Sequence, residues 1–176
     1  DNTAPNLTCP NNTTVGMDAT TCFHTAANGE FDPLIANDNC YTPTTLGYTL
    51  TSISSGTSGS GANTLDGVTF NQGQTLVKWT AMDGSGNTAS CTFIVQVDDL
   101  QAPTINCPGN QTFNTDPGQC TYTVQSTEID LLFWSENCPL DLAWGLSGTN
   151  NDGGSYTLAG YVLQPGLTNV SWVLVE

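Results

Sequence analysis

The stretch WTAMDGSGNTASCTFIVQVD, residues 79–98, decides the fold. Between residues 77 and 81, apolar side chains alternate with polar ones, which is the period of a half-buried β-strand. The Asp-Gly-Ser-Gly-Asn segment at residues 83–87 consists of residues that favour tight turns. Apolar side chains then return at alternate positions from residue 91 to residue 97. We therefore predict a strand, a turn and a second strand, forming the closing hairpin of a β-sandwich domain.

The composition excludes several classes of partner. The chain has 176 residues, a formal net charge of −15, and one Lys or Arg in total. Binding to nucleic acid or to an anionic membrane surface needs clustered Lys and Arg, so we expect neither. No apolar run approaches the length of a transmembrane helix, so we expect no membrane insertion. Cations are the natural counterpart of this chain.

The cysteine content indicates an oxidising compartment. Seven cysteines in a chain of 18.5 kDa are typical of an extracellular, disulfide-bonded protein. Zinc is the alternative use of so many cysteines. However, the sequence has no Cys-x-x-Cys pair and one histidine, His24, so we do not expect a zinc site.

The chain contains an internal repeat. Asp1–Pro5 resembles Asp99–Pro103 at an offset of 98 residues, and three cysteines recur at that same offset: Cys9, Cys22 and Cys40 match Cys107, Cys120 and Cys138. Further on the offset is 93, because Gly73–Trp79 matches Gly166–Trp172. We therefore predict two tandem domains, residues 1–98 and residues 99–176, of which the second lacks its final hairpin strand in this chain.

Three explanations of the missing strand are left open. The polypeptide continues beyond this sequence, a neighbouring molecule donates the strand, or the second copy is a proteolytic remnant. A sandwich without that strand would expose a sheet edge and an apolar groove beside Val170, Trp172 and Leu174.

The rest of the first copy also reads as short strands separated by Gly, Asn and Pro. Their number and spacing are typical of an immunoglobulin-like sandwich, and we expect a flexible Ser/Gly loop at residues 54–61. The predicted strands are Leu7–Val15, Cys22–Ala27, Leu46–Ile53, Leu65–Phe70, Thr75–Met82 and Thr88–Val97.

These residues resemble the hyalin-repeat (HYR) domain family. The matching features are the Asp-x-x-Ala-Pro start, Cys9-Pro10, Asp38-Asn39, the strand entry at Gly73–Trp79, and the segment from Thr80 to Asp98. The match covers all of the first copy and most of the second. The resemblance implies an immunoglobulin-like extracellular module that occurs in tandem arrays in adhesive and matrix proteins. The four-cysteine form is similar to repeats of very large bacterial cell-surface adhesins.

The resemblance also implies a disulfide between Cys9 and Cys91, because the minimal form of the family keeps the counterparts of these two cysteines. The expected topology agrees, since the first and last strands of such a sandwich start at the same end. We expect Cys22 to pair with Cys40, and Cys120 with Cys138, although four cysteines allow three arrangements. Cys107 would then have no partner within this chain.

Acidic residues gather in the predicted loops. Asp1, Asp38 and Asp83 are expected at one end of the first sandwich. Asp98 and Asp99 lie in the linker, and we expect them to face Glu136. Calcium takes six to eight oxygen ligands from such groups, so calcium is a candidate cofactor. The alternative is that these residues form turns by accepting hydrogen bonds from backbone N–H groups.

The chain has candidate sites for attached glycans and a candidate aromatic contact surface. Asn-x-Ser/Thr triplets, which accept glycans in eukaryotic secreted proteins, occur at Asn6, Asn11, Asn12, Asn110 and Asn169. The apolar segment Ile129–Trp134, with Trp144 following, either packs in the core or forms an exposed aromatic surface.

No catalytic constellation is recognisable. His24 stands alone in a predicted strand, and no Gly-x-Ser-x-Gly motif is present. We therefore predict a non-enzymatic, structural and adhesive repeat of an extracellular or cell-surface protein. Its partners would be neighbouring repeats or subunits, or a surface glycan or protein. The alternatives are an accessory, carbohydrate-binding module of a secreted enzyme, and a filament subunit joined by donated strands.

Overall fold

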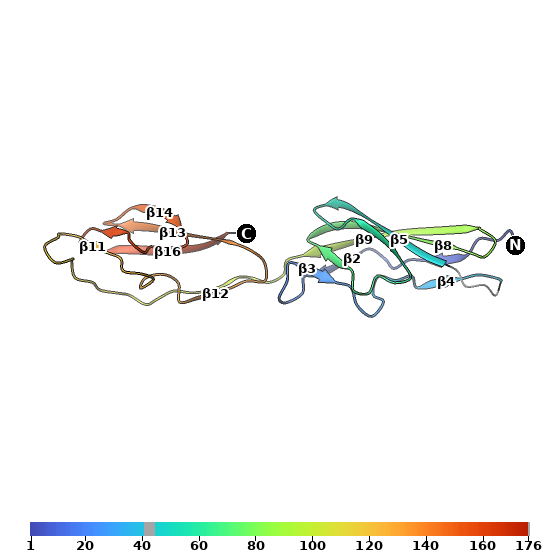
Figure 1. Ribbon diagram of the computed structural model, residues 1–176, viewed down its shortest axis with the longest axis horizontal. Helices are drawn as coiled ribbons and strands as arrows, with labels where there is room; N and C mark the ends of the chain where they lie inside the picture. The colour runs from blue at the N-terminus through green and yellow to red at the C-terminus, as the bar shows by residue number, and fades with distance from the viewer. Residues whose placement is uncertain (41–44, 176) are drawn as a thin grey trace. The chain divides into compact units, whose positions relative to one another are not determined.

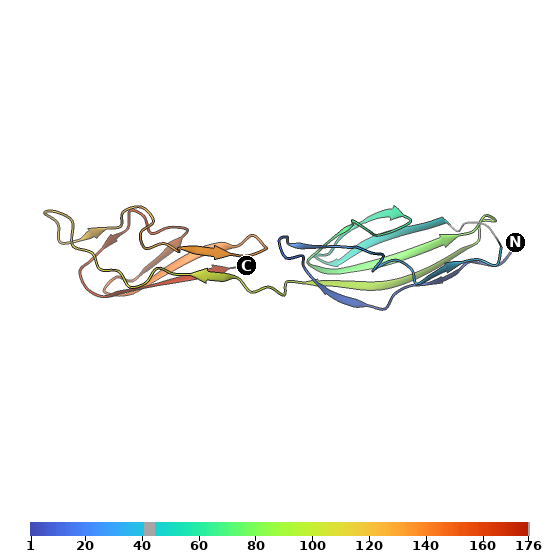
Figure 2. The same cartoon turned by 90° about the horizontal axis from the view of Figure 1, so that it is seen from below.

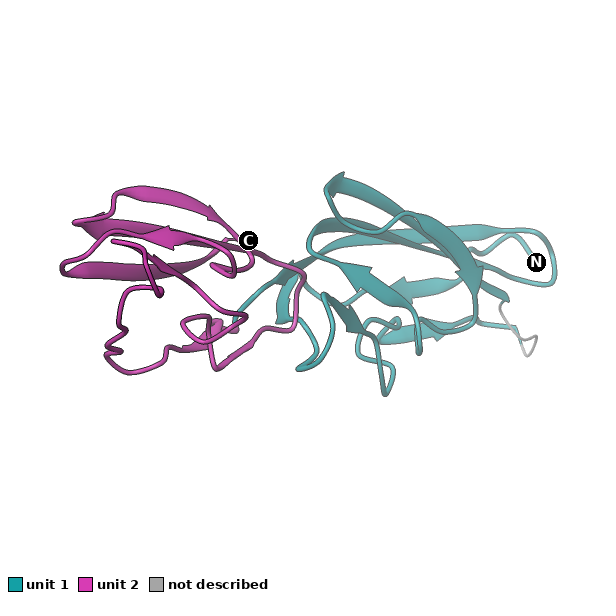
Figure 3. Ribbon diagram, turned by 60° about the vertical axis from the view of Figure 1, so that its left-hand side comes forward, with its two compact units in different colours: residues 1–100 teal, residues 101–176 magenta. Residues whose placement is uncertain are grey.

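A computed structural model describes residues 1–40 and 45–175 of the chain. The described residues form two compact units, Asp1–Leu100 (unit 1) and Gln101–Glu176 (unit 2), shown in teal and magenta in Figure 3. Each unit is built from β-strands, which agrees with the predicted all-β, immunoglobulin-like class. The division lies two residues beyond the boundary predicted between residues 98 and 99.

The main sheet of unit 1 is built around its long strands, which lie side by side in Figures 1 and 2. Its strands in spatial order are β2 (Thr13–Gly16), β9 (Thr88–Asp98), β8 (Gly73–Met82), β5 (Thr45–Ser54) and β6 (Gly59–Ala62). The predicted hairpin is β8 and β9, which pair antiparallel from Gly73↔Val97 to Met82↔Thr88. Its alternating pattern is explained by burial, because Val77, Trp79 and Ala81 are fully buried.

A second layer covers the other side of the unit 1 core. It consists of two antiparallel pairs, β1 (Asn6–Thr8) with β4 (Ile35–Asn37), and β3 (Phe23–Thr25) with β7 (Thr69–Asn71). Between the layers lie the largest buried side chains, which include Trp79, Phe31, Phe70 and Leu65. Rings of Phe31 and Phe70 meet edge to face with centroids 5.0 Å apart.

The single strand predicted at Leu7–Val15 is two strands in the structure. β1 pairs with β4 in the second layer, whereas β2 pairs with β9 in parallel in the main sheet. Pro10 lies between them, and a proline has no N–H to donate to a sheet ladder. The chain therefore leaves one layer at this point and joins the other.

Two further predictions differ from the structure. Residues 59–61, expected in a flexible loop, belong to the edge strand β6, which pairs with β5 through Gly59, Ser60 and Gly61. Gly61 makes room for the Tyr48 side chain, because a Cβ at residue 61 would lie 2.3 Å from the Tyr48 hydroxyl oxygen and the tyrosine would have to shift. The strand expected at Leu65–Phe70 begins later, since the Val68 amide donates to the Leu65 carbonyl in a turn.

Unit 2 has the same plan with shorter strands. Its main sheet has the order β14 (Asp152–Ser155), β13 (Asp141–Gly148) and β16 (Thr168–Val175). The facing pairs are β10 (Thr104–Asn106) with β12 (Phe133–Ser135), and β11 (Tyr122–Thr123) with β15 (Val162–Leu163). A smaller core forms around Val124, Ile129, Trp144, Leu146 and Leu158.

No described residue of unit 2 supplies a counterpart of β9, so the outer edge of β16 is unpaired among the described strands. Gln111–Asn114, the counterpart of β2, accordingly forms no strand within the described residues. Burial shows the same difference, because Val77 of β8 is 0% exposed whereas its counterpart Val170 is 36% exposed. The sheet edge predicted to be open at β16 is therefore unpaired among the described residues of unit 2.

Candidate functional site

Acidic side chains gather at the end of unit 1 where the chain begins. Asp1, Asp38 and Cys40 place one potential ligand atom each within 4.8 Å of one another, and we call this group the acidic end. The Cys40 thiol donates to Asp1 Oδ2 at 2.9 Å, and the Cys40 amide donates to Asp38 Oδ2 at 3.1 Å. The structure therefore brings together two of the predicted calcium ligands, Asp1 and Asp38.

One carboxylate oxygen of the acidic end has no donor. Asp38 Oδ1 is buried and has no hydrogen-bond partner among the described residues. The same is true of Oε2 of Glu136, which occupies the equivalent position in unit 2. A buried carboxylate oxygen without a donor is costly, and a cation would remove that cost. A carboxylate is a suitable calcium ligand at both positions. The sequence alone could not show which of the carboxylate oxygen atoms lack a hydrogen-bond donor.

Asp83 has a different role. It is 5% exposed, its Oδ1 accepts from the amides of Ser85 and Asn87, and its Oδ2 accepts from the Asn87 side chain. The hydrogen bond from the Asn87 side-chain amide lowers the pKa of Asp83, and the backbone amides add to this effect; together they outweigh burial, which acts to raise the pKa. Asp83 therefore holds the hairpin turn, and no described metal-ligating group includes it. The side-chain amide of Asn87 also donates to the Asp1 carbonyl at 3.2 Å.

The remaining predicted ligands belong to other segments of the chain. Asp98 is the last residue of β9, and its Oδ1 accepts from the Gln96 side chain at 2.6 Å. Asp99 follows it in unit 1. Glu136 follows β12 in unit 2, and its Oε1 accepts from the Asn137 amide at 2.6 Å.

Cys9 and Cys91 form a disulfide, the pairing that the family resemblance implied. Their Cα atoms are 5.8 Å apart, and the bond joins residues separated by 82 positions. It connects the chain just after β1 to β9, so the beginning and the end of unit 1 are fastened together. In the chain-entropy model, a loop of this size stabilises the fold by about 4.5 kcal/mol.

The two other predicted disulfides, Cys22–Cys40 and Cys120–Cys138, are not formed. Cys40 and Cys120 are exposed free thiols in the structure, as is Cys107. The reason in unit 1 is distance along the sandwich. Cys22 lies in the turn closed by the Asp18 amide and the Phe23 carbonyl, and the neighbouring Met17 amide donates to Asp98. That contact marks one end of β9.

Cys40 lies at the opposite end of β9. Its thiol contacts Asp1, whose carbonyl accepts from Asn87, the residue before β9 begins. The 11 residues of β9 span about 35 Å at the usual rise per residue. A disulfide requires Cα atoms less than about 7 Å apart. Three cysteines in register between the copies could not reveal this, because sequence spacing does not tell which end of a strand a loop occupies.

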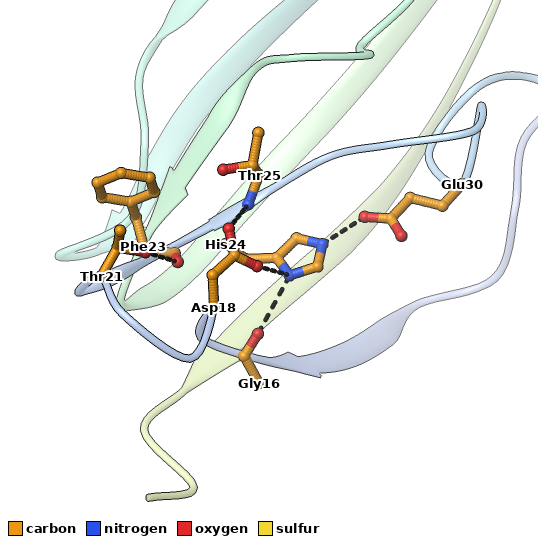
Figure 4. Close-up of polar contacts among 7 residues, drawn as sticks. All are labelled: Gly16, Asp18, Thr21, Phe23, His24, Thr25 and Glu30. Atoms are coloured by element: carbon orange, nitrogen blue, oxygen red, sulfur yellow. Dashed lines mark hydrogen bonds and ion pairs between the residues drawn. The ribbon is translucent and has the colours of Figure 1, made fainter. Parts of the chain in front are cut away.

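His24 lies in β3 and has both ring nitrogens in structural contacts (Figure 4). Nδ1 lies 3.1 Å from the Gly16 carbonyl oxygen and 3.6 Å from a carboxylate oxygen of Asp18, and Nε2 contacts the Glu30 carboxylate. The ring thereby ties β3 to the end of β2 and to the loop at Glu30. His24 is therefore a strand residue with structural contacts, as predicted.

Only part of the predicted aromatic surface is exposed in the structure. Phe133 and Trp134 on β12 are exposed, whereas Trp144 is in the unit 2 core and donates from Nε1 to the Thr157 carbonyl. The first residues of that segment, Ile129 and Asp130, are buried. The asparagines of the predicted glycosylation triplets are all exposed: Asn6, Asn11, Asn12, Asn110 and Asn169.

Comparison with known proteins identifies the family of unit 1. The model of the HYR domain matches residues 1–97 of the chain. The chain belongs to the HYR domain family. HYR domains are immunoglobulin-like, non-catalytic repeats of extracellular proteins, which agrees with the sandwich described here. No curated protein matches the chain.

The HYR match ends within unit 1. The assignment of residues 99–176 as a second HYR-like domain therefore stays a prediction, supported by the shared plan of the two units. Within residues 1–40 and 45–175, we find no helix long and apolar enough to span a lipid bilayer.

Proposed function

We propose that the chain is a load-bearing segment of an extracellular or cell-surface adhesive protein, in which HYR repeats form a stalk or surface filament. The observation that supports this proposal is the Cys9–Cys91 disulfide. A force applied along the chain would enter unit 1 near Asp1 and leave it near Leu100. The disulfide lies between these points and carries the load past the 82 positions that it encloses.

The disulfide therefore limits how far the unit can extend. If unit 1 unfolds under load with the bond intact, the enclosed segment adds no length. Only the residues before Cys9 and after Cys91 can lengthen the stalk. A repeat of this kind keeps a binding region at a nearly constant distance from the surface that carries it.

Single-molecule force spectroscopy of the full chain with Cys22→Ser and Cys138→Ser as the background, held by its two ends, tests this role, because Cys22 and Cys138 are also disulfide-bonded and would otherwise limit the extension. Reduction of the disulfide should lengthen the unfolding step of unit 1 by about 290 Å, at about 3.5 Å per released residue over 82 residues. A Cys9→Ser, Cys91→Ser variant should give the long step under both conditions. Equal steps for the oxidised and reduced background protein would contradict the proposal.

We also propose that calcium stiffens the repeat at the acidic end and at Glu136. Support comes from the buried oxygens of Asp38 and Glu136 that have no donor among the described residues. Support also comes from the net charge of −15, which attracts cations to the whole chain.

A second candidate function is carbohydrate binding by unit 2. The exposure of Phe133 and Trp134, at 59% and 44%, favours it, because aromatic rings on a strand surface can stack on sugar faces. Affinity electrophoresis in gels containing soluble polysaccharides would detect retardation of the chain. Binding of this kind should be lost in Phe133→Ala, Trp134→Ala and kept in Ile35→Ala, which changes the equivalent exposed strand of unit 1. Equal retardation of both variants would exclude β12 as the binding surface.

A further inference from the structure

Two exposed thiols occupy different positions in the repeat. Cys40 follows β4 at the acidic end of unit 1, and Cys120 lies in unit 2 in the turn closed by the Asp116 amide and the Thr121 carbonyl. By the offset of 98 residues, Cys120 is the counterpart of Cys22, and Cys40 is the counterpart of Cys138. The chain thus presents one free thiol of each positional type.

Neither thiol is bonded within its own unit, and the other positional type lies out of reach there. In unit 1, Cys9 and Cys91 are bonded to each other, and Cys22 lies at the other end of β9 from Cys40. In unit 2, the shared plan of the strands places Cys120 far from Cys138 in the same way. A bond between the two positional types can therefore form only between different repeats.

The counterparts of the two free thiols show that both positions support disulfides. Cys22 and Cys138 are disulfide-bonded in the structure, whereas Cys120 and Cys40 are not. Each positional type thus occurs once as a bonded cysteine and once as an exposed thiol. This pattern is expected if such bonds continue beyond the chain at both of the exposed positions.

We propose that Cys40 of one copy of this chain forms a disulfide with Cys120 of a second copy, so that copies are joined head to tail. The two thiols lose two protons and two electrons, and one sulfur–sulfur bond forms. A low-molecular-weight disulfide in the oxidising exterior accepts the electrons and is cleaved to two thiols. The bond pairs two different surfaces, so the two ends of any assembly still present one free Cys40 and one free Cys120, and the assembly can grow.

This inference rests on the proposed extracellular location, since the bond needs an oxidising environment. It goes beyond the stalk function, because the disulfide makes the assembly covalent. Cys9–Cys91 bears load within unit 1, and Cys40–Cys120 would bear it between copies. Force spectroscopy of one chain tests the first bond, and the experiment below tests the second, so the two can fail separately.

The experiment uses the full chain with Cys107→Ser as the background, because Cys107 is a third exposed thiol. The purified protein is incubated with oxidised glutathione and separated on a denaturing gel without reductant. We expect a ladder of dimers, trimers and larger species that dithiothreitol collapses to one band. Peptide mass spectrometry should identify the Cys40–Cys120 linkage.

Single substitutions make the test specific for head-to-tail joining. Cys40→Ser and Cys120→Ser should each stay monomeric, whereas an equal mixture of the two variants should give dimers and nothing larger. Serine at residue 40 keeps a donor for Asp1, and Cys40→Ala with unchanged circular dichroism serves as a second variant. Absence of the ladder, cross-linking of either single variant with itself, or a linkage other than Cys40–Cys120 would overturn the proposal.

Discussion

The indole nitrogen of Trp79 donates a hydrogen bond to the carbonyl oxygen of Phe31 at 2.9 Å in the core of unit 1. This contact joins β8 of the main sheet to the loop between β3 and β4 of the second layer. At the equivalent position in unit 2, Trp172 Nε1 is buried and has no acceptor among the described residues. The same tryptophan is thus satisfied in the unit that has β9 and unsatisfied in the unit without a counterpart of β9.

We predict that Trp79→Phe destabilises unit 1 by about 2 kcal/mol, because it leaves the Phe31 carbonyl buried without a donor and removes packed atoms. Urea denaturation followed by hydrogen–deuterium exchange of β8 peptides measures this change. Trp172→Phe is the matched control, and we expect it to destabilise unit 2 by less than about 1 kcal/mol, since no hydrogen bond is lost. Equal effects of the two substitutions would show that the Phe31 contact contributes nothing.

The uncovered edge of β16 leads to a second prediction. In unit 1, β9 pairs with β8 so that Cys91 lies opposite Trp79 and close to Cys9. A synthetic peptide with the sequence of Thr88–Asp98 should pair in the same register with β16, which places its cysteine opposite Trp172. The peptide should then form a mixed disulfide with Cys107, the counterpart of Cys9. This edge is also where a donated strand would insert in a filament.

Intact-protein mass spectrometry under oxidising conditions detects this adduct, and proteolysis locates it. Attachment should occur at Cys107 in preference to Cys40 and Cys120. A peptide that keeps the cysteine but has aspartate in place of Phe93 and Val95 is the control, because those side chains face the core in unit 1. Equal labelling by both peptides, or labelling spread over all three thiols, would refute a specific strand site.

Calcium should stabilise unit 1 through Asp38. If the dissociation constant is about 1 mM, as in extracellular modules, 10 mM calcium should add about 1.4 kcal/mol to the free energy of unfolding. Thermal unfolding with calcium and with a chelator measures the difference. Asp38→Asn should remove the gain in unit 1, and Asp66→Asn, which removes the same charge from another exposed loop, should keep it. Loss of the gain in both variants would indicate general charge screening.

The sequence was sufficient for the elements that depend on local pattern. The alternation around Trp79 and the turn residues after Asp83 predicted β8 and β9 almost to the residue, because burial on one face imposes the period of two. The immunoglobulin-like class followed from strand number and spacing. Features that depend on contacts between distant parts of the chain were harder to predict from the sequence. The layer change at Pro10 was missed, since an X-Pro break reads equally as a kink within one strand.

The disulfides show the same limit. Cys9–Cys91 was reached through the family resemblance and the shared end of two strands, whereas Cys22–Cys40 paired the two cysteines of the first copy that remained. Those two cysteines are 18 positions apart in the chain, yet the segment between them runs the length of the sandwich. The acidic end was predicted only in part. The sequence indicated which loops lie at the same end of the sandwich, but it could not indicate the hydrogen bonds within each loop. Those bonds decide that Asp38, and not Asp83, has a carboxylate oxygen without a donor.

A last prediction concerns alkaline pH and unit 2. The Tyr122 hydroxyl donates to the Glu128 carboxylate, and its ring stacks on Phe113 with centroids 4.6 Å apart. The hydrogen bond to Glu128, followed by burial and the negative charges of Glu128 and Asp116, raises the pKa of Tyr122 to about 12. An unfolded tyrosine titrates near pH 10. The stability that this contact contributes should therefore be complete below about pH 10 and disappear as the pH rises to about 12.

Tyr122→Phe isolates this effect, because phenylalanine keeps the stack on Phe113 and removes the hydroxyl. The absorbance at 295 nm of the wild type minus that of the variant should titrate near pH 12. Subtraction is needed because two other tyrosines also have raised pKa values. The hydrogen bond to Asp141 raises the pKa of Tyr156, and burial, followed by the contact with Asp152, raises that of Tyr161. The stability difference between the two proteins should shrink over the same pH range. A difference titration centred near pH 10 would mean that the Glu128 contact does not persist in solution.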